Sequence, residues 1–391
     1  MPPIHVVLLP GFLGIDLVDS TGTRLWLDPA TILAGHVDIA ARLTLDPSGE
    51  RDATPGLDVR PEKPIGFIYD PLTVALGAAG VVVHTFLFDY RKPILAAARD
   101  LRAFIAREAP GERVWLVGHS IGGPLAALYP YLDPTTDPPT VDPTWQDQIA
   151  GVVCHGGTLL GTFEAVEALT GTHWFLAVIG LGNTAREDAL RRCLSTWPGL
   201  LALLPDPTHF PDVDRVYDAA QWPAGYQPLQ QHLDAVYSTK RLVRESPLFT
   251  APIPIAQFLS DTYHTTGALD PNATPLRLAP RTAPGDDTVP LFAAAPNGNV
   301  RVLRTGFPHT FIPTDPDVIR DTIDFIRTGT CAAPEIPPVG PDATLPGNAP
   351  SPPIAMLFGM GGALARELPG LVSGQRTLRE IAHLFTGKRR S

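Results

Sequence analysis

Residues 115–129, WLVGHSIGGPLAALY, join a short apolar run to a helical pattern through Gly118-His119-Ser120-Ile121-Gly122. A buried strand that enters a helix through Gly-x-Ser-x-Gly holds its serine on a sharp, strained turn. Glycine suits both flanking positions because a Cβ there would clash with the neighbouring helix or strand. The N-terminal N–H groups of the helix favour a developing negative charge at the same turn. The stretch therefore predicts that Ser120 is a nucleophile, and the alternative is a serine that only caps the helix.

Apolar runs of strand length alternate with helical patterns on both sides of this turn. Such alternation is typical of a mostly parallel sheet flanked by helices, whose strands are buried on both faces. We expect strands over residues 4–9, 81–88, 114–117, 149–154, 253–259 and 300–304. We expect helices over residues 93–107, 121–129 and 317–327, the last with Asp315 or Thr314 as its N-cap.

The texture of the sequence changes between the fourth and fifth expected strands. We assign residues 1–157 and 250–330 to an α/β core and residues 158–249, helical and rich in Trp and Leu, to an inserted cap. A loop-rich excursion is expected over residues 26–71. Residues 331–353 form a Pro-rich stretch typical of an extended linker. Residues 354–391 form a tail, interpreted as a packed or frayed terminal helix, with a docking element for a membrane or partner as the alternative.

Composition limits the classes of protein that this chain can belong to. Its 391 residues are 44% apolar and 18% charged, which is enough for a sizeable core, and its 44 prolines favour long irregular connections. A formal net charge of −10 argues against nucleic-acid binding. Three cysteines, Cys154, Cys193 and Cys331, indicate free thiols. The N-terminus lacks the pattern of a secretory leader and the longest apolar stretch, residues 174–182, is too short to span a bilayer, so we expect a soluble, cytoplasmic protein.

A nucleophilic serine needs a base, and in hydrolases with this turn the base is a histidine late in the chain. His309 lies in GFPHT, after the sixth expected strand and before the closing helix. Downstream of the acidic segment GDDTVP, residues 285–290, the other histidine is His383, in the tail. We interpret His309 as the base, and the alternative is a surface loop histidine.

The acid that orients this histidine is expected between the serine and the histidine. The segment GDDTVP, residues 285–290, offers two carboxylates. We prefer Asp286, because a loop before Val-Pro can turn one carboxylate inward. Asp287, the adjacent residue, and Asp261, which follows the fifth expected strand, are the alternatives.

Two backbone N–H groups are needed to hold the negative charge that forms on an attacked carbonyl. One is expected from Ile121, the residue after the nucleophile, and the other from Phe12 in the loop Pro10-Gly11-Phe12-Leu13-Gly14. The alternative for this loop is an ordinary Gly-rich turn. We find no metal-ligand spacing and no phosphate-binding glycine loop, so neither a metal nor another cofactor is expected.

Several segments together resemble the lecithin:cholesterol acyltransferase-like family of α/β-hydrolases, which includes lysosomal phospholipase A2. They are VVLLPGFLG from residue 6, Trp26-Leu27 with TPGLDVR from residue 54, FDYR from residue 88, GHSIGG from residue 118, GGTLLGT from residue 156 and GDDTVPL from residue 285. The resemblance covers about residues 4–327 and implies an α/β-hydrolase fold with Ser120, Asp286 and His309 as a catalytic triad. It also implies acyl-ester chemistry on lipids, with a mobile lid. Secreted members carry a signal peptide and a lid disulfide, neither of which this sequence shows, and Tyr90 stands where the family has Trp.

We therefore expect a serine esterase or lipase that cleaves small-molecule or lipid esters through an acyl-enzyme, with the apolar segment 174–204 lining an acyl pocket. One alternative is an acyltransferase that passes the acyl group to an alcohol. Another is a hydrolase-like binding protein without activity. Transient contact with a membrane surface through the cap or the tail is a further hypothesis, and nucleic acid is not expected as a partner.

Overall fold

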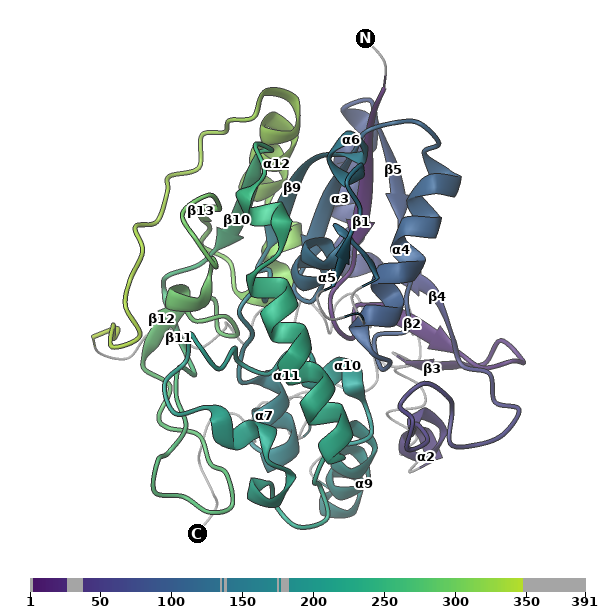
Figure 1. The fold of residues 1–391 in the computed structure, drawn as a ribbon, viewed down its shortest axis with the longest axis vertical. Helices are drawn as coiled ribbons and strands as arrows, with labels where there is room; N and C mark the ends of the chain where they lie inside the picture. The colour runs from purple at the N-terminus through teal and green to yellow at the C-terminus, as the bar shows by residue number, and fades with distance from the viewer. Residues whose placement is uncertain are drawn as a thin grey trace, which may run out of the picture.

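The computed structural model describes residues 3–26, 38–133, 136, 139–173, 176 and 183–346. Its centre is a six-stranded sheet in the order β13-β10-β9-β6-β1-β5, with every neighbouring pair parallel (Figure 1). The strands are β1 (Ile4–Leu9), β5 (Val81–Thr85), β6 (Val114–His119), β9 (Ile149–His155), β10 (Ile255–Leu259) and β13 (Arg301–Arg304). All six expected strands are therefore confirmed as the members of one sheet.

The sheet is covered on both faces, which explains why its strands read as continuous apolar runs. Val6 and Leu8 of β1 belong to one buried cluster and Val7 and Leu9 to another, because successive side chains point to opposite faces. The first cluster includes side chains of α3 (Gly66–Ala78) and α12 (Pro316–Thr328). The second includes side chains of α4 (Ile94–Glu108) and α5 (Gly122–Leu128).

The ends of several elements follow local capping rules. Helix α12 begins at Pro316, and the Asp315 side chain accepts from the Asp317 N–H at 2.9 Å, so Asp315 rather than Thr314 is the N-cap.

Strand β5 ends at Thr85, earlier than the expected residue 88. The chain then turns through Arg91, which is fully buried and donates to the carboxylates of Asp89 and Asp52 at 2.7 and 2.9 Å. These contacts attach the end of β5 to the preceding excursion.

The described part of the excursion expected over residues 26–71 contains regular structure, namely α2 (Asp38–Leu43), β4 (Arg60–Pro64) and the start of α3. Strand β4 pairs antiparallel with β2 (Ile15–Val18), which also pairs with β3 (Arg24–Trp26), so the sheet has the order β3-β2-β4. Strand β4 reads RPEKP and α3 contains Pro71. Because proline is disfavoured inside strands and helices, residue propensities predict neither element. The expectation of a loop-rich excursion was wrong over these elements.

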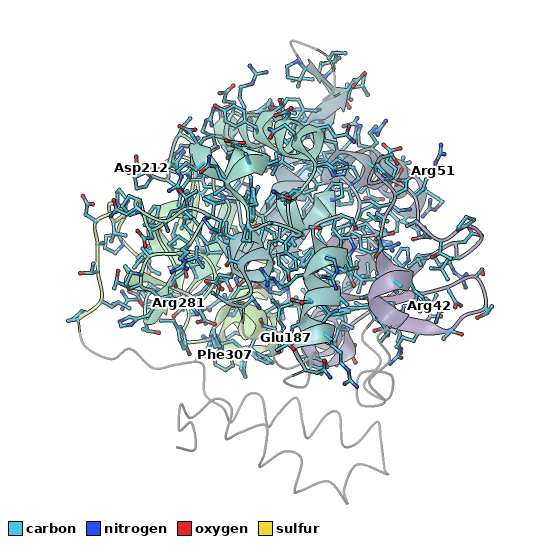
Figure 2. All side chains as sticks on the ribbon, turned by 90° about the horizontal axis from the view of Figure 1, so that it is seen from below. Arg42, Arg51, Glu187, Asp212, Arg281 and Phe307 are labelled. Carbon is cyan, nitrogen blue, oxygen red and sulfur yellow. The ribbon has the colours of Figure 1, made fainter. Side chains whose placement is uncertain are left out.

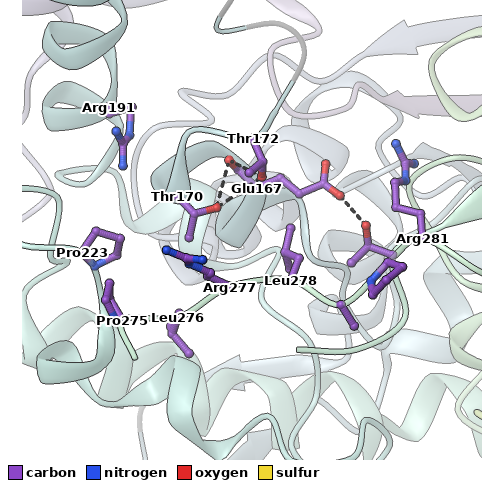
Figure 3. Close-up of a pocket in the computed structure, with 13 residues that line it drawn as sticks. Glu167, Thr170, Thr172, Arg191, Pro223, Pro275, Leu276, Arg277, Leu278 and Arg281 are labelled. Carbon is purple, nitrogen blue, oxygen red and sulfur yellow. Dashed lines mark hydrogen bonds between the residues drawn. The ribbon is translucent and has the colours of Figure 1, made fainter. Parts of the chain in front are cut away.

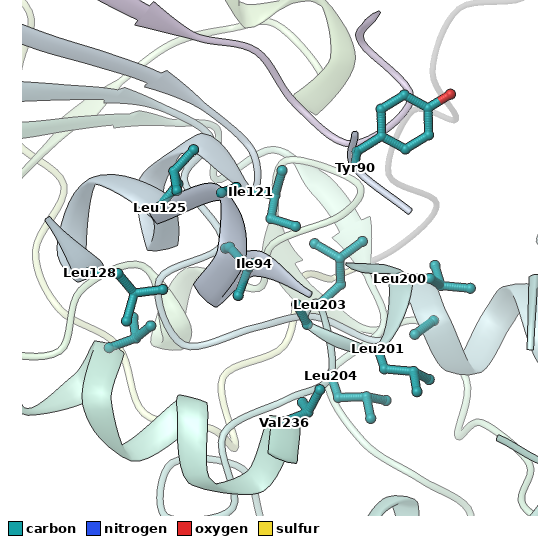
Figure 4. Close-up of a cluster of buried hydrophobic side chains, with 14 of the residues drawn as sticks. Tyr90, Ile94, Ile121, Leu125, Leu128, Leu200, Leu201, Leu203, Leu204 and Val236 are labelled. Atoms are coloured by element: carbon teal, nitrogen blue, oxygen red, sulfur yellow. The ribbon is translucent and has the colours of Figure 1, made fainter. Parts of the chain in front are cut away.

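Residues 158–249 supply helices that lie over one end of the sheet (Figure 1). Leucines of α10 (Pro198–Leu201) and of the residues after it belong to one buried apolar cluster with Ile121, Tyr90 and Val236 of α11 (Gln230–Arg244) (Figure 4). The helices are α7 (Glu164–Thr170), α9 (Thr184–Leu194), α10 (Pro198–Leu201) and α11 (Gln230–Arg244), with 3-10 turns η1 (Asp214–Tyr217), η2 (Ala219–Gln221) and η3 (Pro247–Thr250). This packing fastens the insertion directly onto the turn after β6.

The remaining elements are short. They are β7 (Tyr131–Asp133), β8 (Thr140–Val141), α6 (Trp145–Gln148), β11 (Tyr263–Thr265), β12 (Ala283–Gly285), η4 (Leu291–Ala293) and η5 (His309–Thr314). Strands β11 and β12 pair antiparallel just before residue 286, and η5 begins at the candidate base.

The Pro-rich segment after α12 is extended, but it is attached to the sheet edge. The Ile336 N–H donates to the Val302 carbonyl at 2.8 Å and the Ile336 side chain is buried. Residues 347–391, including the predicted tail, lie outside the described residues. Charged side chains such as Arg51 and Asp212 lie at the surface (Figure 2). Within the described ranges, no helix combines the length and the apolar character needed to cross a bilayer.

Candidate active site

Ser120 occupies the sharp turn that its sequence predicts. Its φ is +54°, in the left-handed region that a non-glycine residue rarely adopts. A Cβ at Gly118 would lie 2.7 Å from the Gly122 backbone, and a Cβ at Gly122 would lie 2.3 Å from the Leu9 carbonyl oxygen. Both glycines are therefore needed for the turn to close against α5 and β1.

Asp286 and His309 meet in the buried interior, although 23 residues separate them. The His309 Nδ1 atom lies 2.9 Å from Oδ2 of Asp286, whose side chain is fully buried. The other oxygen, Oδ1, accepts from the N–H groups of Thr288 and Val289 at 3.1 and 2.6 Å. Because an ionised carboxylate only accepts, Nδ1 carries the proton in this pair. Burial opposes charging of His309, but the Asp286 carboxylate and its hydrogen bond raise the imidazole pKa above its ordinary value.

The structure separates the three candidate acids. Asp287 turns toward Arg281, whose Nη2 lies 2.7 Å from its Oδ1. Asp261 pairs with Arg304 at 2.7 Å. Of the three, Asp286 is the carboxylate that contacts His309. Burial also raises the pKa of Asp287 to about 6, a shift that the Arg281 charge opposes.

Ser120 and His309 lie at the same edge of the sheet without a hydrogen bond between them. Among the described residues, the Ser120 hydroxyl and His309 Nε2 have no hydrogen-bond partner. The ring centroid of His119, the residue before Ser120, lies 5.3 Å from that of His309. In enzymes without substrate, catalytic hydrogen bonds are often long and tighten in the substrate complex. The structure thus brings Asp286 and His309 into contact, and Ser120 follows directly in the chain after His119, which contacts His309.

Two backbone donors are available at the turn. In the part of the chain that the structure describes, the N–H groups of Phe12 and Ile121 donate to no acceptor, and the same holds for Leu13. Ile121 is 1% exposed, so its free N–H is buried. Buried backbone donors are rarely left unpaired, and such a group at a helix start is suited to hold an oxyanion.

A chain of buried hydrogen bonds surrounds these groups. The Gly11 N–H lies 2.7 Å from the Tyr69 hydroxyl oxygen, which lies 2.8 Å from His119 Nδ1. His119 Nε2 lies 3.2 Å from the His309 carbonyl oxygen. Gly156, with φ +61°, makes room for the pair beside it, since a Cβ there would lie 2.7 Å from His309 Nδ1.

One described group of side chains has the composition of a metal site. Donor atoms of Glu164, Glu167 and His173 all lie within 4.8 Å of one another. His173 Nε2 is already 2.7 Å from Oε2 of Glu164, and Oε1 of Glu164 accepts from the Thr288 hydroxyl at 3.1 Å. The Glu164 carboxylate raises the pKa of His173 against the effect of burial, while His173 lowers that of Glu164 to about 2. The raised pKa of His173 favours an ion pair with Glu164, and Glu164 in turn contacts Thr288 in the GDDTVP loop.

This ion pair predicts a pH-dependent contribution to stability. His173 has a raised pKa in the folded state, so its contribution is complete below about pH 6.5 and is lost as the pH rises through the folded value. Glu164 has a lowered pKa, so its contribution is present above about pH 4.5 and is lost as the pH falls toward 2. We expect Glu164→Gln to lower the free energy of unfolding by about 1.5–3 kcal/mol at pH 6 and by less at pH 9. Urea unfolding at the two pH values measures the difference.

The control for this prediction is Glu50→Gln, which removes an exposed carboxylate. It should leave the free energy of unfolding nearly unchanged at both pH values. An equal loss of stability at pH 6 and pH 9 in Glu164→Gln would show that the charge of His173 is not involved.

A cavity of about 570 Å³ lies beside this group (Figure 3). Glu167, whose Oε1 accepts from the Thr266 hydroxyl at 2.6 Å, forms part of its wall, and so does Arg281, the partner of Asp287. Arg191, Arg277, Thr170 and Thr172 also line it. Apolar side chains, among them Leu276 and Leu278, complete the lining. Of the described residues in the segment 174–204, only Arg191 lines this cavity, so it is not the acyl pocket expected from that segment. In that segment most of residues 174–182 lie outside the described residues, and Leu200, Leu201, Leu203 and Leu204 belong to the buried apolar cluster that includes Ile121 and Tyr90.

Comparisons with known proteins agree with the fold. A chain of the Tle4–Tli4 complex is similar over 84% of this chain and 99% of its own length, at 13% identity and a TM-score of 0.57. The mature lipase BlEst2 of Bacillus licheniformis is similar over 84% and 94%, at 12% identity and a TM-score of 0.40. A monoacylglycerol lipase of Paleococcus ferrophilus is similar over 82% and 93%, at 16% identity and a TM-score of 0.36. The chain has the α/β-hydrolase fold, with a mostly parallel sheet flanked by helices.

No protein-family model matches the chain, and no curated protein matches it by sequence. The resemblance to the lecithin:cholesterol acyltransferase-like family therefore stays a prediction at the level of the family. The fold that the resemblance implied is confirmed.

Sequence reasoning missed four residues around the candidate site. Tyr69 lies on a helix that was not expected, and His119 was noted only as part of the Gly-x-Ser-x-Gly pattern. Gly156 belongs to a Gly-Gly pair after β9, which was a visible signal for a close approach. Glu164 carries no local signal, because its partners Thr288 and His173 are defined only by the fold.

Proposed function

We propose that this chain is a serine hydrolase that cleaves carboxylic esters, with Ser120 as nucleophile, His309 as base and Asp286 as the orienting acid. The observation that supports it best is the buried contact of 2.9 Å between His309 Nδ1 and Asp286 Oδ2. With the proton of the imidazole on Nδ1, the free electron pair is on Nε2, the atom that must accept the serine proton. The neighbouring turn bears a strained serine beside two free N–H groups.

The proposed reaction has two stages. His309 Nε2 takes the proton of the Ser120 hydroxyl as Oγ attacks the ester carbonyl carbon, and the N–H groups of Phe12 and Ile121 donate to the resulting oxyanion. The imidazolium then gives its proton to the leaving alcohol, and an acyl-enzyme remains. Water, deprotonated by the same histidine, attacks the acyl-enzyme, and the imidazolium returns the proton to Ser120 Oγ as the bond to the acyl group breaks and the acid leaves.

The substrate is proposed to carry an apolar acyl chain, in line with a lipid ester. The buried apolar cluster that includes Ile121, the residue after Ser120, also includes four leucines of the insertion, Leu200, Leu201, Leu203 and Leu204 (Figure 4). Burial of an acyl chain among apolar side chains is favourable by about 0.8 kcal/mol for each methylene group.

The test combines a covalent probe with a panel of substrates. A fluorophosphonate should label the chain at Ser120, located by peptide mass spectrometry, and p-nitrophenyl esters of increasing acyl length should be hydrolysed alongside a phospholipid. Added acceptor alcohols report acyl transfer by the appearance of a new ester. A folded, pure protein that is neither labelled nor active on any of these esters would overturn the proposal.

A further inference from the structure

We propose that Tyr69 and His119 are positioning residues that link the loop of the oxyanion donor to the backbone of His309. This inference rests on the proposed function, because it assigns roles around the same serine. Its basis is a continuous path of buried hydrogen bonds through Gly11, Tyr69, His119 and His309, which are brought together from four separate parts of the chain.

The direction of each hydrogen bond follows from the donors available. A tyrosine hydroxyl has one proton to donate. Its oxygen accepts from the Gly11 N–H at 2.7 Å, so its proton is directed to the remaining neighbour, His119 Nδ1, at 2.8 Å. His119 Nδ1 is therefore an acceptor and carries no proton.

This fixes the tautomer of His119. With Nδ1 accepting, a neutral imidazole carries its proton on Nε2, which donates to the His309 carbonyl oxygen at 3.2 Å. Burial and the neighbouring His309 charge lower the pKa of His119 well below its ordinary value, which is consistent with a neutral ring. The opposite tautomer would face the His309 carbonyl with a bare nitrogen and would leave two acceptors unpaired.

His119 supplies a restraint on His309 that Asp286 does not. Asp286 holds His309 twice, through Nδ1 at 2.9 Å and through the backbone N–H, which donates to the Asp286 carbonyl at 2.8 Å. Both contacts come from one residue, so that pair can move as a unit. The contact to the His309 carbonyl attaches the unit to His119, the residue immediately before Ser120.

The other end of the path reaches the oxyanion loop. Gly11 precedes Phe12, and a Cβ at Gly11 would lie 2.8 Å from His119 Nδ1 and 3.0 Å from the Ser120 Cβ. The loop thus packs directly on the turn, and the Tyr69 hydroxyl holds its backbone there. One phenol therefore sets the distance between the oxyanion donor and the base, which are the groups whose geometry limits the rate.

The test compares two tyrosine hydroxyls. Tyr69→Phe removes the shared hydroxyl but keeps the ring, and we expect kcat for a p-nitrophenyl ester to fall on the order of 10²-fold with little change in KM. The matched control is Tyr129→Phe, which removes a buried hydroxyl that donates to Gln148 on another part of the fold. Equal, small effects on kcat in the two variants, with wild type active, would overturn the positioning role and leave the proposed function standing.

A second pair of variants and a spectroscopic readout separate positioning from packing. His119→Gln keeps a neutral donor and acceptor on a side chain of similar reach and should retain much more activity than His119→Phe. Nitrogen-15 NMR of histidine-labelled wild type should show His119 as the Nε2–H tautomer, and Tyr69→Phe should change that tautomer balance. A protonated or Nδ1–H His119 in wild type would overturn the inference, whether or not the protein hydrolyses esters.

Discussion

Replacing Ser120 by alanine is expected to lower kcat for a p-nitrophenyl ester by about 10⁶-fold. The variant retains the glycines of the turn, the N–H groups of Phe12 and Ile121 and the Asp286–His309 pair, but it has no atom that can form the acyl-enzyme. Stability should change little, because the Ser120 hydroxyl has no hydrogen-bond partner among the described residues and alanine has a Cβ like that of serine. Steady-state rates and thermal melts on the same preparation measure both quantities.

The control is Ser238→Ala, on the exposed side of α11, where the hydroxyl only donates to the Asp234 carbonyl of its own helix. It should match wild type in rate and in labelling by a fluorophosphonate. If Ser120→Ala kept more than about one hundredth of the wild-type kcat, Ser120 could not be the nucleophile. A loss of activity accompanied by unfolding would point instead to a role of the serine in the turn.

The central sheet was predictable because each of its strands carries its own signal. Strands buried on both faces need apolar side chains at nearly every position, so β1 and β6 are visible in isolation. The antiparallel strands β3 and β4 are short and lie outside the central sheet, and the five positions of β4 are two prolines and three charged residues. Their pairing depends on β2, which no local pattern reveals.

The residues of the candidate site also differ in whether the local sequence predicts them. Ser120, Asp286 and His309 could be proposed from the sequence, because triad chemistry requires these residue types in a fixed order along the chain. Tyr69 contacts His119, 50 residues away, and Glu164 contacts Thr288, 124 residues away. The sequence around Tyr69 and around Glu164 contains no pattern that predicts these contacts. A sequence motif thus indicates the residues proposed to react. The residues that contact and position them come from distant parts of the chain and can be identified only in the folded structure.

The second large effect is expected from Asp286→Asn, which should lower kcat by about 10⁴-fold. The reason lies in how Asp286 is held. Its Oδ1 accepts from the N–H groups of Thr288 and Val289, so the carbonyl oxygen of asparagine will keep that place and its NH₂ will face His309 Nδ1. Nδ1 must then become the acceptor, and the ring proton moves to Nε2, the atom that should receive the proton of Ser120. His309 is then still present, but its Nε2 carries a proton and cannot accept the proton of Ser120.

The pH profile and two neighbouring carboxylates make this prediction specific. The Asp286 carboxylate raises the pKa of His309, and activity needs the neutral ring, so kcat/KM of the wild type should decline as the pH falls through that raised value. Without the carboxylate the pKa of His309 falls, and the residual activity of Asp286→Asn should persist to lower pH.

Asp287→Asn and Asp261→Asn remove carboxylates that pair with Arg281 and Arg304, and each should cost much less in kcat. A larger loss in either of them than in Asp286→Asn would transfer the orienting role to that residue, because only the carboxylate that sets the tautomer of the base can produce both the drop in rate and the shift of the acid limb.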